Sequence, residues 1–355
     1  MTEKTTVIFT ITNAAGLGHI TRGLAVARRL QTLNIESVFF TTSVAIELIR
    51  KEGFKYFYVP TKSFFPSEVT MNLWVDFVKR QLDEVVRMYK PAGIIYEGVL
   101  PSSSMIIELQ KYKNIKRIWI KRENYKAGWQ SLNTLEQQFD LIVVPKEVGN
   151  SYGEVVETDK KKYCNPITLL DANEAYSRKS VRDGLGVKRD ERLYYVQLGV
   201  GSNIILQNAL MYVQQHLLKR RKTKVIIGES LVDIPIGVID KSIKAISIYP
   251  SSRYFRGIDF AIAAAGYNTF HELVQFKVPT LFIPNESTVV DDQVNRARNL
   301  EQEHAALRLD TLHNLDSKLD LLEKSQKQII KKLKTYEVPN GALDAARMIA
   351  SILGD

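Results

Sequence analysis

Short apolar runs alternate with longer segments of helical periodicity through the first half of the chain. The runs predict strands over 6–12, 37–41, 54–59, 93–96, 115–120 and 140–144, and the periodic segments predict helices over 21–33, 44–52 and 73–89. Strands that alternate with helices form βαβ units, in which a parallel sheet carries helices on both faces. The first half is therefore predicted to be a doubly wound α/β domain.

The same alternation returns in the second half after a break. Polar, mixed sequence runs from about Asn165 to Asp190, and strands are then predicted over 193–198, 225–227, 245–248, 260–264 and 280–283. A last helix is expected over 341–353, because Pro339-Asn340-Gly341 interrupts the preceding pattern. A chain of 355 residues also exceeds what one hydrophobic core usually organises. The predicted fold class is α/β, with two Rossmann-like doubly wound parallel-sheet domains (1–165 and 166–340) facing a central cleft, and a C-terminal helix over 341–355.

Composition places the chain among soluble proteins. Hydrophobic residues make up 45% and charged residues 25% of the chain, which is ordinary for a globular domain. No apolar run is long enough to span a bilayer. The one cysteine, Cys164, excludes an intramolecular disulfide and fits a reducing compartment. We expect a cytoplasmic protein on these grounds.

The net charge of +10 bears on the choice of partner. Basic runs such as 160–162 and 219–222 lack the interleaved aromatics of a single-strand nucleic-acid platform, and no zinc-finger spacing is present, so we expect no nucleic-acid partner. A surface that attracts anionic lipid head groups or polyanionic substrates, and a merely solvated surface, both stay open. The segment 62–80 mixes aromatics with cations, which fits either a peripheral membrane patch or an acceptor-pocket helix packed on the core.

The stretch AAAGYNTFHE, residues 263–272, carries the clearest chemical signal. A predicted strand is followed by a turn at Gly266 and a helix opened by Asn268 and Thr269, and the N-terminus of a helix offers backbone N–H groups to a phosphate. Glu272 lies one turn further, within reach of a ribose hydroxyl. After the next predicted strand, Asp292-Gln293 is placed to face the same crevice and to hold a sugar. Phosphate, ribose and sugar in one line describe a nucleotide-sugar site.

A second loop, NAAGLGH, follows the first predicted strand. Its spacing is not the dinucleotide-binding G-x-G-x-x-G pattern. Gly16 and Gly18 permit tight turns, and His19 opens the following helix at the carboxyl end of a strand, where ligands of α/β sheets bind. His19 is therefore a candidate general base for a hydroxyl. Glu97, at the end of strand 93–96, either orients His19 or takes the proton itself.

The remaining candidates are weaker. The loop with Gly199, Gly201 and Ser202 offers donors to a pyrophosphate. Arg122 and Glu123 follow strand 115–120 and are predicted to contact an acceptor. The five histidines have no metal-ligand spacing and Asp291-Asp292 is not a D-x-D motif, so no metal and no cofactor besides a substrate nucleotide sugar is expected.

At these residues the chain resembles the GT-B glycosyltransferases of families 1 and 28, including the C-terminal domain of the lipid II-forming N-acetylglucosaminyltransferase. The resemblance rests on the span from Gly266 through Pro279 to Asp292-Gln293 and on the loop Gly16-x-Gly18-His19. It implies that Gly266, Asn268 and Thr269 bind pyrophosphate, that Glu272 binds ribose, and that Asp292 and Gln293 bind sugar hydroxyls. It also implies that His19 is the acceptor base and that Ile248 and Tyr249 contact the nucleotide base.

Two departures limit the resemblance. Ala264 stands where the plant signature has a phosphate-binding histidine, and Lys121-Arg122-Glu123-Asn124 stands where the lipid II enzyme has His-Glu-Gln-Asn, so lipid II is not assigned as the product. The resemblance implies an inverting, metal-independent transfer from a nucleoside diphosphate sugar, with UDP as the commoner nucleotide. The expected acceptor is a hydroxyl group, and a lipid-linked acceptor, a cell-envelope polysaccharide and a small molecule all stay open. A sugar-nucleotide 2-epimerase and a non-catalytic nucleotide-sugar-binding subunit are the alternatives.

Overall fold

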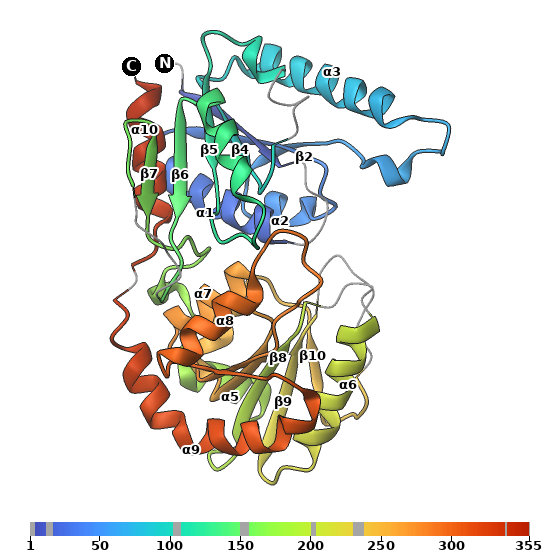
Figure 1. The fold of residues 1–355 in the computed structure, drawn as a ribbon, viewed down its shortest axis with the longest axis vertical. Helices are drawn as coiled ribbons and strands as arrows, with labels where there is room; N and C mark the ends of the chain where they lie inside the picture. The colour runs from blue at the N-terminus through green and yellow to red at the C-terminus, as the bar shows by residue number, and fades with distance from the viewer. Residues whose placement is uncertain are drawn as a thin grey trace. The chain divides into compact units, whose positions relative to one another are not determined.

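The computed structural model describes residues 4–11, 17–101, 108–149, 156–199, 204–229, 238–337 and 339–354, without the side chains of 130–133. The chain divides into two compact units. The first unit comprises Met1–Lys146, Glu154–Leu169 and Asn340–Asp355, and the second comprises Glu147–Gly153 and Leu170–Pro339. The chain therefore passes between the units more than once, and its C-terminal segment belongs to the first unit (Figure 1).

The first unit is built on a parallel sheet. Its described strands are β1 (Thr6–Ile11), β2 (Glu36–Thr41), β3 (Lys55–Tyr58), β4 (Gly93–Glu97), β5 (Lys116–Ile120), β6 (Leu141–Pro145) and β7 (Lys161–Cys164). They lie in the order β3-β2-β1-β4-β5-β6-β7, and every pair is parallel. The order reverses between β1 and β4, and a reversal of this kind opens a ligand-binding crevice beyond the strand ends.

Helices pack on this sheet through their apolar faces. They are α1 (Gly18–Thr32), α2 (Ile46–Lys51), α3 (Met71–Tyr89) and the C-terminal α10 (Ala342–Leu353). α10 packs against α1 and against the strands β5, β6 and β7. At Gly341, just before α10, a Cβ atom would collide with the backbone of Asn165, so glycine permits this close approach of two chain segments.

The second unit repeats the architecture. Its described strands are β8 (Arg192–Gln197), β9 (Thr223–Gly228), β10 (Lys244–Ile246), β11 (Phe260–Ala263), β12 (Thr280–Phe282) and β13 (Leu307–Arg308), parallel and in the order β10-β9-β8-β11-β12-β13. Its helices are α5 (Arg178–Leu185), α6 (Ile204–Leu218), α7 (Tyr267–Gln275), α8 (Gln293–Gln302) and α9 (Leu315–Leu333). Here the strand order reverses between β8 and β11, so a second crevice is expected where those strands end.

The predicted α/β fold with two parallel sheets is confirmed, and each predicted strand corresponds to an observed one with shifted ends. The helix predicted over 21–33 begins earlier, at Gly18, and the strand predicted over 245–248 ends at Ile246. The stretch 165–190, interpreted as irregular, contains α5. This short helix is mostly polar and buries Val181 and Leu185 alone among its residues, so its periodicity is weak. No helix in the described part of the chain has both the length and the apolar character to cross a membrane.

Candidate active site

His19 and Glu97 meet where the strand order of the first unit reverses. His19 is the second residue of α1, which follows β1, and Glu97 is the last residue of the neighbouring β4. His19 Nδ1 lies 2.7 Å from Glu97 Oε2, and the two side chains are 9% and 0% exposed. The sequence placed both residues at strand ends, and the fold brings their side chains into contact.

Arg22, one turn further along α1, completes this group. Its Nε lies 2.6 Å from Glu97 Oε1, and its Nη2 lies 2.5 Å from the same oxygen. Burial alone would raise the pKa of Glu97, but the charges and hydrogen bonds of Arg22 and His19 outweigh burial and hold that pKa below its ordinary value. Glu97 is therefore ionised at neutral pH.

The ionised carboxylate fixes the tautomer of His19. A carboxylate can only accept hydrogen bonds, so His19 Nδ1 carries a proton and donates a hydrogen bond to Glu97 Oε2. Because the proton of the neutral ring is on Nδ1, the other ring nitrogen, Nε2, has the lone pair that can accept a proton. An imidazole held in this way by a buried carboxylate is suited to take a proton from a hydroxyl group.

The predicted acceptor residues lie in the same unit. Gly18 is the first residue of α1 and directly precedes His19. Arg122 is half-buried on the segment after β5, the strand next to β4. Gly16 lies outside the described residues.

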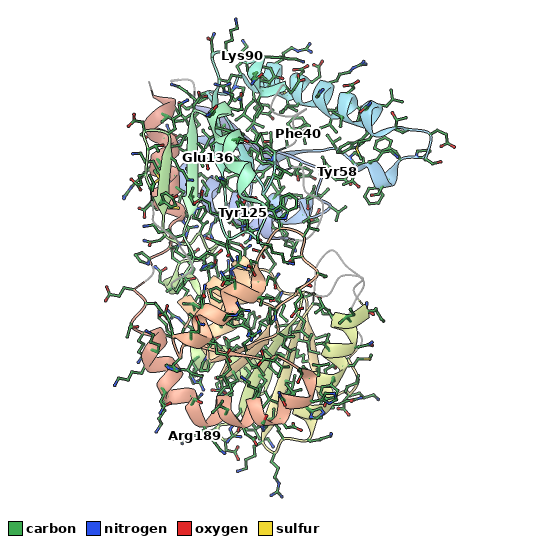
Figure 2. The ribbon with its side chains drawn as sticks, viewed as in Figure 1. Phe40, Tyr58, Lys90, Tyr125, Glu136 and Arg189 are labelled. Carbon is green, nitrogen blue, oxygen red and sulfur yellow. The ribbon has the colours of Figure 1, made fainter. Side chains whose placement is uncertain are left out.

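Glu123 belongs to a partly buried ion cluster. It accepts a hydrogen bond from the Tyr163 hydroxyl at 3.0 Å and forms ion pairs with Lys121 and Lys161. Glu136, labelled in Figure 2, binds the same two lysines. The cluster links the segments after β5 and before β6 to β7, so the carboxylate of Glu123 has internal partners whatever else it contacts.

The second unit carries a pocket of about 110 Å³ where its own strand order reverses. The pocket is lined by Gln197, Leu198, Gly199, Ala264, Gly266, Thr269, Asn285 and Gln293. Gly266 is the N-cap of α7, and Thr269 lies in the first turn of that helix. Four residues predicted from the sequence, Gly199, Gly266, Thr269 and Gln293, are therefore brought together.

Other predicted donor residues lie outside this lining. Asn268 is in the first turn of α7, while Gly201 and Ser202 lie outside the described residues. Asp292 is the N-cap of α8, and its Oδ1 accepts a hydrogen bond from the backbone N–H of Asn295 at 2.9 Å.

Glu272 is buried in α7 and held by one hydroxyl. Ser252 Oγ donates to Glu272 Oε1 at 3.0 Å. Burial raises the pKa of Glu272 to about 7, although the bond from Ser252 acts in the opposite direction. Ile248 and Tyr249 shortly precede the 3-10 helix Ser251–Gly257, which supplies Ser252. The predicted base-contacting and ribose-contacting residues are therefore connected through that short helix.

Half of the residues that line the pocket were not predicted from the sequence, and neither was Arg296, whose side chain holds the loops beside the pocket. Gln197, Leu198, Ala264 and Asn285 line the pocket. Each lies at or just beyond the carboxyl end of a predicted strand, and that position was the available signal.

Arg296 in α8 is fully buried and ties the loops of the pocket together. Its Nε and Nη2 donate to the two carboxylate oxygens of Glu147, each at 2.7 Å. Nη1 donates to the backbone carbonyl of Ala265 at 2.7 Å, and Nη2 donates to Asp291 at 2.8 Å. Burial would lower the pKa of Arg296, but the two carboxylates raise it well above its ordinary value, so the guanidinium stays charged. The loops before Gly266 and before α8 are thereby held by one side chain.

Comparisons with known proteins give this arrangement a context. The sequence model of the glycosyltransferase family 28 C-terminal domain matches residues 238–347. Over 103 residues the chain is 30% identical to the UDP-N-acetylglucosamine--N-acetylmuramyl-(pentapeptide) pyrophosphoryl-undecaprenol N-acetylglucosamine transferase of Thermosipho melanesiensis. This match spans 27% of the chain and 30% of that relative.

Solved structures resemble the whole chain. The MurG protein of Acinetobacter baumannii has a TM-score of 0.65 at 16% identity, with 98% of this chain and 99% of that chain covered. The spinosyn forosaminyltransferase SpnP has a TM-score of 0.68 at 12% identity, with 99% and 100% covered. The chain has the GT-B glycosyltransferase fold. Within this GT-B protein, the family 28 match includes Gly266, Glu272 and the Asp292-Gln293 pair. In the described part of the chain, no three His, Cys, Asp or Glu side chains come together as metal ligands.

Proposed function

We propose that this protein is an inverting, metal-independent glycosyltransferase that moves a sugar from a nucleoside diphosphate sugar to an acceptor hydroxyl. The observation that carries the proposal is the His19–Glu97 pair, with 2.7 Å between Nδ1 and Oε2, because donor binding alone needs no such base. The family 28 match over 238–347 supports a nucleotide-sugar donor. UDP-sugars are the first donors to test.

The donor is assigned to the second unit. The backbone N–H groups at the start of α7, with Gly266, Asn268 and Thr269, receive the diphosphate together with the Gly199 loop. Glu272 takes the ribose hydroxyls, and Ile248 and Tyr249 contact the base. Asp292 and Gln293 hold the sugar. All eight residues that line the pocket are uncharged, so neutral donors and the helix dipole would balance the charge of the diphosphate.

The first unit is assigned the proton transfer. His19 Nε2 takes the proton of the acceptor hydroxyl. At the same time the hydroxyl oxygen of the acceptor attacks the anomeric carbon of the sugar from the face opposite the diphosphate. The bond between that carbon and the diphosphate oxygen breaks, and the nucleoside diphosphate leaves with the electron pair. Glu97 positions the ring and stabilises its charge after proton transfer, with Arg22 holding Glu97 in place.

We infer a lipid-linked acceptor, which Gly18, Arg122 and Glu123 would help to bind. The Thermosipho relative carries pyrophosphoryl-undecaprenol in its name. In the first unit, exposed apolar side chains gather at the start of α3 and in the loop before it: Phe64 (65% exposed), Met71 (58%) and Leu73 (59%). Figure 1 shows α3 and this loop extending beyond the edge of the sheet. Lys62 and Arg80 lie on the same segment, so this patch would enter the interfacial region of an anionic membrane.

The double variant Phe64→Ser, Leu73→Ser is expected to bind anionic vesicles at least about tenfold more weakly than the wild type. Burial of a large apolar side chain contributes roughly 1.5–3 kcal/mol, so two such losses exceed a tenfold change. Co-sedimentation with phosphatidylglycerol-containing vesicles measures the effect. Met88→Ser is the control, because Met88 is equally exposed near the other end of α3. Equal sedimentation of the double variant and the wild type would remove the membrane assignment.

A thermal-shift panel of nucleoside diphosphates and nucleotide sugars tests the donor assignment. We expect the members of one nucleotide family to raise the unfolding temperature, because a ligand that binds the native state alone stabilises it. The parent nucleoside should produce a smaller shift, since it lacks the diphosphate. No shift with any nucleotide would contradict the proposed function.

A further inference from the structure

Gln197 is a polar residue of the pocket that no motif identifies. It ends β8, and its Oε1 accepts a hydrogen bond from the Tyr195 hydroxyl at 2.6 Å. Because the amide oxygen is held in this way, the NH₂ group of Gln197 is the part of the side chain available to a ligand in the pocket. The NH₂ group of Gln197 therefore gives the pocket a hydrogen-bond donor at the end of β8.

Tyr195 is placed so that it holds Gln197 firmly. The side chain is buried in β8, and the Ser251 hydroxyl also contacts its phenolic oxygen. The phenol lies over Gly228, where a Cβ atom would collide with it, so a glycine at the end of β9 makes room for the hydroxyl. Ser251 opens the short helix that also carries Ser252, the partner of Glu272.

Gln293 has the same orientation on another wall of the pocket. Its Oε1 accepts a hydrogen bond from the backbone N–H of Asn285 at 3.0 Å. Its Nε2 lies 3.9 Å from the point where a Cβ atom on Gly266 would be. Two glutamine amides thus have their oxygens bound inside the protein and their NH₂ groups left for the pocket.

The position of Gln197 shows which part of a donor it would meet. Gln197 pairs in register with Ala263 of β11, and its backbone carbonyl accepts from the N–H of Ala264 at 2.9 Å. Gly266 follows two residues later and caps α7, so the side chain lies at the foot of the α7 N-terminus, with Thr269 on the first turn. A set of neutral donors at the positive end of a helix is suited to an anion.

We propose that Gln197 is a direct ligand of the donor diphosphate and that Tyr195 is the positioning residue that turns its NH₂ group toward the phosphate oxygens. This inference rests on the proposed function, because it names a ligand of the same donor site. Gln197 should therefore contribute to the affinity for a nucleoside diphosphate but not to the affinity for the parent nucleoside, whereas Glu272 should contribute to both.

The test compares UDP with uridine on wild type and variants by calorimetry, with dTDP and thymidine as a second pair. Gln197→Glu should weaken UDP binding by about 100-fold or more, because a donor to a charged group is lost and a negative charge is added beside the phosphates. Gln197→Met should lose about tenfold, and Tyr195→Phe a smaller factor. Uridine affinity should stay unchanged in all three. Gln215→Glu, on the exposed face of α6, adds the same charge to the same unit and should leave both affinities unchanged.

The outcomes separate this inference from the function on which it rests. If wild type binds neither these pairs nor any other nucleoside diphosphate of the thermal-shift panel, the proposed function fails and the role of Gln197 fails with it. If wild type binds UDP and Gln197→Glu binds it equally well, the inference alone is overturned. Stronger UDP-sugar binding by Gln197→Glu with unchanged UDP affinity would make Gln197 a sugar ligand instead. An equal loss of UDP and uridine would indicate a structural role and also overturn the inference. Gln197→Met decides the matter if Gln197→Glu does not fold.

Discussion

His19→Ala is expected to lower kcat by about 1,000-fold while the affinity for the nucleoside diphosphate stays unchanged. General-base catalysis contributes roughly 10²–10⁴-fold in enzymes, and in the proposed mechanism the acceptor proton has no recipient besides His19. The affinity should not change because the donor residues belong to the second unit and His19 belongs to the first. Initial rates of nucleoside diphosphate release, with calorimetric binding on the same samples, measure both quantities.

Glu97→Gln provides the comparison for this result. The amide keeps the size of the side chain but can donate to His19 Nδ1, which would move the ring proton to Nε2 and block the base. The rate should therefore fall as well, with the nucleotide affinity intact. The same change leaves the buried Arg22 without its carboxylate, so the unfolding temperature must be followed in parallel. Turnover of His19→Ala close to that of wild type would defeat the assignment of the base.

Glu272→Ala is expected to weaken nucleoside diphosphate binding by about 100-fold. Ribose hydroxyls donate to the carboxylate in this account, and hydrogen bonds to a charged group contribute roughly 1.5–3 kcal/mol. The pKa of Glu272 is raised to about 7 by burial. Because the hydroxyls stabilise the ionised form, the affinity of wild type should rise as the pH increases through about 7. Calorimetric titration between pH 5.5 and 8.5 measures this dependence, and Glu272→Gln should remove it.

The stability of the free protein should follow the opposite trend. A carboxyl group whose folded pKa is raised from 4.5 to about 7 contributes stability that is fully present below about 4.5 and lost as the pH rises through 7. The contribution is about 3 kcal/mol by linkage. Glu272→Gln, which resembles the protonated form, should lack this component of the pH dependence of unfolding. If the nucleotide affinity of wild type does not change between pH 5.5 and 8.5, the role of Glu272 is contradicted.

The fold was predictable because parallel strands buried on both faces are continuous apolar runs. β1 and β8 are nearly fully buried, and both were found from hydrophobicity alone. β7 was missed because its sequence, KKYC, begins with two lysines, the first of which, Lys161, pairs with Glu123. The course of the chain between the units was also beyond reach, since local patterns do not show that Glu147 packs with Arg296, far along the sequence.

The residues of the candidate site could be predicted where the backbone needs a particular residue type, such as glycine in a turn or a small polar residue at a helix start. Gly266 and Thr269 lie in a sequence pattern of strand, glycine turn and helix start, which can be recognised without a structure. His19 follows the first strand in the same kind of pattern. Gln197 and Arg296 carry no such mark. Their roles come from tertiary partners, Tyr195 for one and Glu147 for the other, which only the folded chain assembles.

The product of the reaction tests the central claim most directly. Wild-type protein would be incubated with the nucleotide sugar that gives the largest thermal shift and a short-chain polyprenyl diphosphate-linked sugar in detergent, and the anomeric protons would be followed by NMR. We expect free nucleoside diphosphate and an equal amount of glycosylated acceptor, with an anomeric configuration opposite to that of the donor. Donor recovered with its sugar epimerised, or nucleotide sugar bound and released without change, would contradict it.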